Sequence, residues 1–267
     1  MKERSPLASF RLLLGGVLLA LGVAQAPQGL AQNATAATVP TGPGSLSGMW
    51  QNADYHGTGQ STARAREMRT GDGQKLPLQP WAAALLEKRV TAADDRGVIF
   101  ANTISQCLPG GVPEMLFGAS YPVQILETPG QVTELFDEQN HFRIIRLDAQ
   151  HAKNPDPSYM GDSVGHWEGD TLVVDTIGLN DKTTLDMVGT PHTDKLHVIE
   201  RYRRISADRI EIRVTVEDPG AFTRLWETQV TYKAVSPGTR MDEYICENNR
   251  NAADASGNQS FEGGARF

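Results

Sequence analysis

Alternation of apolar and polar side chains is the feature that most limits how this chain can fold. In residues 209–218, four Ile and Val residues alternate with charged residues and a threonine. A period of two residues predicts a β-strand with one buried face and one face in water. Residues 225–234 repeat the pattern, with Trp226, Val230 and Tyr232 on one face. The short polar connection between the two runs predicts antiparallel neighbours.

The same reading gives a mostly β domain. Further strands are predicted at 48–51, 123–127, 132–137, 141–147, 164–167, 171–177, 196–205 and 241–246. One helix is predicted over residues 81–90, where Ala, Leu, Glu and Lys are strong helix formers. An antiparallel meander this long must hide its edges, either in a sandwich or in a closed barrel. We expect the barrel, with one or two short helices.

The amino-terminal segment predicts export. Lys2, Arg4 and Arg11 precede or open an apolar run of residues 12–24, and small residues follow up to Ala31. This is the pattern of a secretory signal peptide, which we place at residues 1–31. The alternative is a membrane anchor, but a spanning helix needs about 20 apolar residues. A linker at 32–45, a barrel domain at 46–249 and a flexible tail at 250–267 complete the predicted organisation of a periplasmic or secreted protein.

Charge and cysteine content narrow the partners. Removal of residues 1–31 takes away three basic residues and one acidic residue, so the net charge of −7 becomes −9. Such a charge argues against nucleic acid or an anionic membrane surface as a partner. The cysteines are Cys107 and Cys246, which predict a disulfide in an exported chain, the alternative being two buried thiols. No zinc site is expected from them, because neither has a second ligand at zinc spacing.

Two short motifs suggest chemistry only weakly. Residues 161–165 match the G-x-S-x-G pattern of serine hydrolases, with Ser163 as nucleophile. The residues that follow predict a hairpin, whereas the pattern requires a helix there. His192 and His197 could bind a metal with a carboxylate, but their odd separation would place them on opposite faces of a strand. A loop histidine with a polar partner is the simpler interpretation of His192.

Strand alternation also predicts charged side chains inside the barrel. Glu200 and Tyr202 share the apolar face of their strand, Arg143 and His141 share a face of theirs, and Glu243 shares a face with Met241 and Ile245. Buried charges must be paired or used. One interpretation is an internal Arg–Glu network that fixes strand register, and the other is a polar cluster in a ligand cavity.

The run from Gly161 to Thr176, GDSVGHWEGDTLVVDT, resembles a large group of secreted, mostly uncharacterised bacterial proteins. The resemblance covers most of residues 45–250, including 107–113, 200–202 and 243–246. Members of this group are lipocalin-like, so the resemblance implies a lipocalin-like barrel and no particular activity. This chain departs from the group at Gly110-Gly111, where two prolines or Pro-Gly are expected.

The leading functional hypothesis is a barrel that takes a small apolar or aromatic acid. Arg143 would bind the carboxylate, and Glu200 or Glu243 would act as acid or base with His141 or Tyr202 assisting. Trp167 and His192 are further candidates for substrate contacts. By analogy of fold with phenolic acid decarboxylases, its sharpest form is a lyase without a cofactor. The alternatives are a non-catalytic periplasmic binding protein and a serine hydrolase at Ser163.

Overall fold

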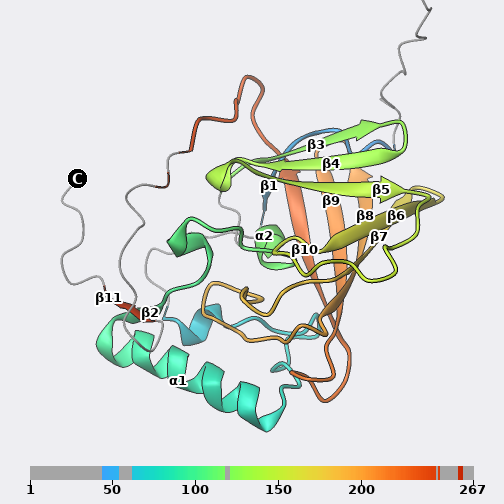
Figure 1. Ribbon diagram of the computed structural model, residues 1–267. Helices are drawn as coiled ribbons and strands as arrows, with labels where there is room; N and C mark the ends of the chain where they lie inside the picture. Colours follow the sequence, from blue (N-terminus) through green and yellow to red (C-terminus); the bar gives the residue numbers. More distant parts are fainter. Residues whose placement is uncertain (1–43, 54–61, 118–120, 245, 247–257, 261–267) are drawn as a thin grey trace, which may run out of the picture. The chain divides into compact units, whose positions relative to one another are not determined.

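A computed structural model describes residues 44–53, 62–117, 121–244, 246 and 258–260, all within one compact unit. Nine strands form a closed barrel (Figure 1). They are β1 (Gly48–Asn52), β3 (Val123–Thr128), β4 (Gln131–Phe136), β5 (His141–Leu147), β6 (Asp162–Glu168), β7 (Thr171–Ile177), β8 (His197–Ser206), β9 (Arg209–Glu217) and β10 (Trp226–Ala234). The closed barrel that the sequence predicts is confirmed.

One strand pair departs from the predicted meander. Neighbouring strands pair antiparallel except for β5 and β6, which run parallel. The reason is the connection at 148–161, which carries Pro155 and Pro157 and returns along the barrel before β6 begins. The barrel closes through β1, which pairs antiparallel with both β3 and β10.

The predicted alternation is what fills the barrel. On β9, Ile210, Ile212, Val214 and Val216 are fully buried, and the residues between them face outward. On β10, the buried positions include Trp226 as predicted. The interior is therefore a packed apolar core into which any polar group must bring its own partners.

A long helix and a second small sheet lie outside the barrel, whereas the short helix α2 (Glu114–Phe117) packs Met115 and Leu116 against the barrel core. Helix α1 (Pro80–Arg96) covers the predicted 81–90 and extends to Gly97, whose φ of 64° ends it in the left-handed conformation. The remaining elements are η1 (Arg64–Arg66), η2 (Ile104–Gln106), α2 (Glu114–Phe117), η3 (Glu138–Asn140) and a two-stranded sheet of β2 (Val98–Phe100) and β11 (Asn258–Ser260). In the described part of the chain, no helix is long and apolar enough to span a bilayer.

The predicted strand at 241–246 is wrong. Residues 241–244 have no regular secondary structure. One of their contacts is a hydrogen bond from the Asp242 amide to Asp137 Oδ1 at 2.8 Å. Cys246 forms the predicted disulfide with Cys107. A covalent tie at this point fixes the segment without strand pairing.

The ends of the chain bear only partly on the predicted organisation. The signal peptide at 1–31 and most of the linker at 32–45 lie outside the described residues. Ser45, at the end of the predicted linker, is buried and donates to Glu127 Oε1 at 3.0 Å, so it belongs to the barrel. Within the predicted flexible tail, residues 258–260 form β11, and the rest lies outside the described residues.

Candidate functional site

Five neighbouring strands place polar side chains at one level of the barrel interior. We call this set the arginine cluster, and its members are Glu134, Arg143, Ser163, Thr176, Glu200 and Tyr202, each at most 3% exposed. Pairing aligns Glu134 of β4 with Arg143 of β5, and Ser163 of β6 with Thr176 of β7. Alternation therefore brings together side chains that are far apart in the sequence.

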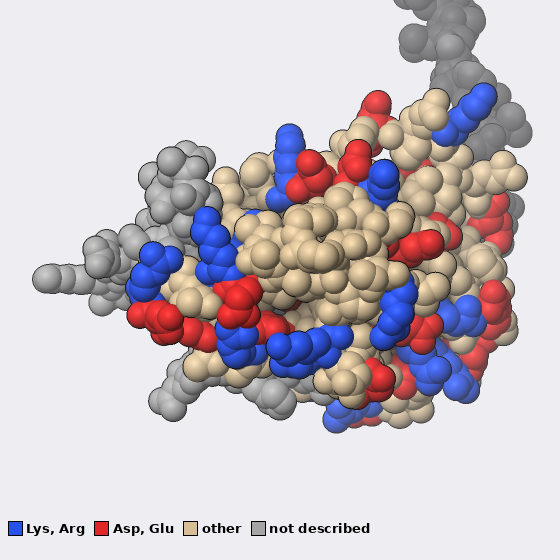
Figure 2. Space-filling model, turned by 90° about the horizontal axis from the view of Figure 1, so that it is seen from below, with Lys and Arg blue, Asp and Glu red and all other residues tan. Residues whose placement is uncertain are grey.

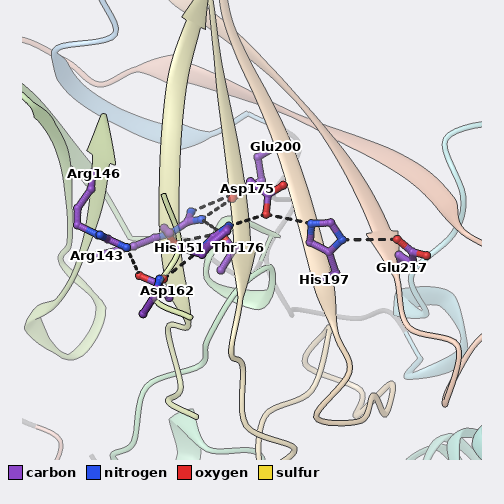
Figure 3. A network of polar contacts seen from close by, with 11 residues as sticks. Arg143, Arg146, His151, Asp162, Asp175, Thr176, His197, Glu200 and Glu217 are labelled. Atoms are coloured by element: carbon purple, nitrogen blue, oxygen red, sulfur yellow. Dashed lines mark hydrogen bonds and ion pairs between the residues drawn. The ribbon is translucent and has the colours of Figure 1, made fainter. Parts of the chain in front are cut away.

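The guanidinium group of Arg143 is fully bonded within the arginine cluster. Its Nε donates to Ser163 Oγ at 3.0 Å, and Nη2 donates to Thr176 Oγ1 at 2.7 Å and to Glu200 Oε2. Its Nη1 donates to Glu200 Oε1 at 2.9 Å and Glu134 Oε2 at 3.2 Å. Figure 3 shows the contacts of Arg143 with Thr176 and Glu200. Because guanidinium has five N–H groups, no donor remains for a ligand.

Burial controls protonation here. Desolvation raises the pKa of Glu134, an effect that Arg143 opposes and Glu200 reinforces. Burial also raises the pKa of the Tyr202 phenol, which stays protonated and donates to Glu134 Oε1 at 2.8 Å and Glu200 Oε1 at 3.0 Å. One cation facing two carboxylates makes a self-contained network, the register-fixing arrangement considered from the sequence.

The predicted interior set is partly right. Arg143, Glu200 and Tyr202 point inward as predicted. Glu134 was missed, although it shares the buried face of its strand with Val132 and Phe136. Two other expected members of the set do not join it.

Glu243 is exposed, because its segment is not a strand. His141 is half buried at the start of β5, where its Nε2 lies 3.1 Å from Gln139 Oε1, and burial lowers its pKa. Neither side chain has a contact with the arginine cluster among the described residues.

Ser163 does not sit on a nucleophile elbow. It lies within β6, and the chain continues through a hairpin into β7. Its hydroxyl contacts Arg143 Nε and Thr176 Oγ1, and no histidine of the described residues bonds to it. The geometry required of a serine hydrolase is therefore not present. Trp167, farther along β6, is half buried against the barrel core.

A second polar network crosses the outer face of the barrel (Figure 3). His151 lies between Asp162 and Asp175, and His197 lies between Asp175 and Glu217. The contacts of His151 fasten the 148–161 connection to β6 and β7, and those of His197 link β8 to β7 and β9. No group of three or more His, Cys, Asp or Glu residues in the described chain has the arrangement of a metal site. His192 and His197 therefore belong to no such group.

A pocket of about 400 Å³ lies between α1, β2 and the segment that joins β7 to β8. Its walls are Trp81, Leu85 and Arg89 of α1, Phe100 of β2, and residues 181–184 and 191–194. Seen from the α1 side of the molecule, the surface has a broad area free of charged side chains, bordered by Lys, Arg, Asp and Glu (Figure 2). The pocket itself combines an apolar side, formed by Trp81, Leu85, Phe100 and Pro191, with polar and charged groups that include Arg89, Lys182, Asp181 and Asp194.

Arg89 is held in place at this pocket by its neighbours. Its guanidinium carbon lies 3.7 Å from the centroid of the Phe100 ring, and Nη1 donates to the Gly189 carbonyl. Burial lowers the pKa of Arg89 to about 10, with a smaller opposing effect from Asp186. Arg89 is thus charged at neutral pH, and no carboxylate of the described residues forms an ion pair with it. Nothing in the sequence pattern singled out this arginine.

His192 lines the same pocket and is buried, as a satisfied loop histidine would be. Its Nε2 accepts from the Thr183 hydroxyl at 2.7 Å, and its Nδ1 donates to the Thr193 carbonyl at 2.9 Å. Burial lowers the pKa of His192, with smaller opposing effects from its hydrogen bond to Thr193 and from nearby carboxylates. The sequence suggested His192 as a substrate contact, and its position at a pocket is compatible with that role.

Comparisons with known proteins add little. No protein-family model and no curated protein matches the chain. One solved structure, of a secretory abundant heat soluble (SAHS) protein from Ramazzottius varieornatus, matches at 12% identity and a TM-score of 0.33, covering 74% of this chain and 100% of that one.

Proposed function

We propose that this protein binds a small apolar or aromatic molecule with an acidic group, in the pocket formed by α1, β2 and residues 181–194. The observation that carries the proposal is Arg89, a charged and partly buried guanidinium at a pocket wall that forms no ion pair with a carboxylate of the described chain. Asp186 acts on Arg89 by charge alone, without an ion pair, so this partly buried cation still favours an anionic ligand that bonds to it directly.

The shape and lining of the pocket favour an apolar body on that ligand. A volume of about 400 Å³ lies within the range of small-molecule sites. Trp81 is 47% exposed at the wall, and Phe100 already stacks with the Arg89 guanidinium. An aromatic ring bound in the pocket could contact the rings of Trp81 and Phe100, while its acidic group bonds to Arg89.

The arginine cluster does not favour the decarboxylase-like form of the hypothesis. Every donor of Arg143 is bonded to protein, and the side chains of Arg143, Glu134 and Glu200 are at most 1% exposed. A substrate would have to break this network to reach the carboxylates. We therefore place ligand recognition at Arg89, and assign Arg143, Glu200 and Tyr202 to the stability of the barrel.

Binding is tested by calorimetry with benzoate and cinnamate, using their uncharged amides for comparison. We expect the acids to bind and Arg89→Met to weaken them about 10- to 100-fold, since hydrogen bonds to charged groups contribute about 1.5–3 kcal/mol. Arg96→Met is the matched control, because Arg96 is an exposed residue on the last turn of the same helix. Equal binding of acids by Arg89→Met and wild type, or no binding of any acid, would refute the proposal.

We also propose that the protein works outside the cytoplasm, in the periplasm or as a secreted protein. The Cys107–Cys246 disulfide supports an oxidising compartment. Expression of the full chain with a carboxyl-terminal tag, followed by mass spectrometry of its amino terminus, tests this directly. A mature protein that begins after Ala31 is expected, and recovery of only the uncleaved chain in the cytoplasm would contradict export.

A further inference from the structure

We propose that Thr183 and His192 are a nucleophile and its general base, and that the pocket hydrolyses esters of small aromatic compounds that carry a separate, free acidic group. The class of substrate rests on the proposed function, because Arg89 lines the same pocket. The hydrolysis itself rests on the separate geometry of Thr183 and His192.

The hydrogen bonds of His192 define which of its nitrogens is basic. Nδ1 faces the carbonyl oxygen of Thr193 at 2.9 Å, so it carries the hydrogen. The lone pair is then on Nε2, which accepts the Thr183 hydroxyl hydrogen at 2.7 Å. A hydroxyl that donates to an imidazole oriented by a third group is the arrangement that activates serine and threonine nucleophiles.

A buried carboxylate holds the third group in place. Asp218, which is 1% exposed, accepts from the Thr193 amide at 2.6 Å and from the Thr193 hydroxyl at 2.7 Å. It also accepts from the Gly220 amide at 2.9 Å. Asp218 is therefore a positioning residue, which orients His192 through Thr193 without touching a ligand. The lowered pKa of His192 keeps the imidazole neutral, and hence able to take a proton, at pH 7.

If Thr183 and His192 had no access to a pocket, their hydrogen bond could serve only to stabilise the fold. Instead, both side chains line the pocket, together with the Arg89 guanidinium. A substrate whose free acidic group bonds to Arg89 would therefore share its pocket with the threonine hydroxyl.

Apart from water, the reaction needs no further reagent. Thr183 Oγ1 forms a bond to the ester carbonyl carbon, its proton passes to His192 Nε2, and the carbonyl electrons move to oxygen. Collapse breaks the bond to the leaving alcohol, which takes the proton from His192. Water then attacks the acyl-threonine while His192 accepts its proton, and the acid is released as Thr183 regains its hydrogen.

The test uses the mono-4-nitrophenyl ester of terephthalic acid, which carries a free carboxylate, and follows nitrophenolate release. We expect turnover by wild type, retention in Thr183→Ser, and a loss of at least about a hundredfold in Thr183→Val and in His192→Gln. Thr171→Val is the matched control, because Thr171 lies on the hairpin between β6 and β7 and does not line the pocket. Rapid quenching should trap an acyl group on the peptide that contains Thr183.

Calorimetry with terephthalate on the same variants separates loss of chemistry from loss of fold or of binding. Thr183→Val should bind the product acid within about threefold of wild type. Wild type that binds terephthalate but releases no nitrophenolate above background would overturn the inference and leave the proposed function standing. A different outcome is a protein that binds no acid but hydrolyses the uncharged 4-nitrophenyl benzoate, with this activity lost in Thr183→Val. That result would support Thr183 and His192 as nucleophile and base and refute the role of Arg89.

Discussion

Replacing Arg143 with methionine tests whether the arginine cluster stabilises the barrel. Methionine has a similar reach but neither charge nor donors, so the guanidinium bonds to Glu134, Ser163, Thr176 and Glu200 are all lost. Two carboxylates at most 1% exposed then face each other without a cation. Removal of one partner of a buried ion pair costs about 3–5 kcal/mol. For a domain of this size, that lowers the melting temperature by roughly 6–20 °C.

The assay is urea unfolding followed by tryptophan fluorescence, at pH 7.5 and again near pH 4.5. Burial raises the pKa of Glu134 above its unfolded value, so its protonated form is favoured in the fold. A group with a raised folded pKa contributes stability that is present below the unfolded pKa and is lost as the pH rises through the folded pKa. Without Arg143 this dependence should strengthen, and the variant should recover part of its stability at the lower pH.

Arg201→Met serves as the control, since the ion pair of Arg201 with Glu168 lies on the exposed face of the barrel. Its unfolding midpoint should stay close to that of wild type. A loss below about 1 kcal/mol for Arg143→Met at pH 7.5, or an equal loss at both pH values, would refute the assignment of the cluster as a stabilising network.

Three further variants test other parts of the structure. Burial raises the pKa of Glu138 from 4.5 to about 7, so the stability that its protonated form contributes is lost as the pH rises from about 4.5 to 7. In urea unfolding, Glu138→Gln should remove this pH dependence and stabilise the protein at pH 8 by up to about 3 kcal/mol. Replacing Cys107 and Cys246 by serine should lower the free energy of unfolding by up to about 4–5 kcal/mol, as should reduction of the wild type; an unfolding midpoint equal to that of the oxidised wild type would show that the bridge does not stabilise the fold. A Cβ on Gly189 would lie 2.9 Å from Arg89 Cδ at a φ of +92°, so Gly189→Ala should weaken aromatic-acid binding by calorimetry about tenfold or more, and unchanged affinity would show that Arg89 does not need this packing.

Alternation predicted most of the barrel because the buried and exposed faces of a strand can be recognised from the residues of that strand alone. It placed Arg143, Glu200 and Tyr202 inside correctly, and it held enough signal to find Glu134 as well. It failed at 241–246, where a disulfide and scattered hydrogen bonds order a segment that has no strand partner. Alternation in six residues cannot distinguish these two cases.

The pocket could not be predicted in the same way. Arg89 comes from a helix, Phe100 from a short strand, and Thr183 and His192 from an irregular segment, so no common period relates them. The parallel pairing of β5 with β6 was equally hidden, although the long proline-containing connection between them was visible. Both features depend on how non-local segments pack, which a single sequence pattern does not report.

The seam at β1 has a consequence for how the chain reaches its native state. Trp50 pairs with both Val123 and Ala234, so the last closure joins segments separated by most of the domain. Contacts of such long range form slowly, and until they form the strands beside the seam present unpaired backbone groups. A polypeptide released before β10 has been synthesised would therefore keep an open sheet edge, and premature truncation in this region should yield insoluble chains rather than a smaller soluble domain.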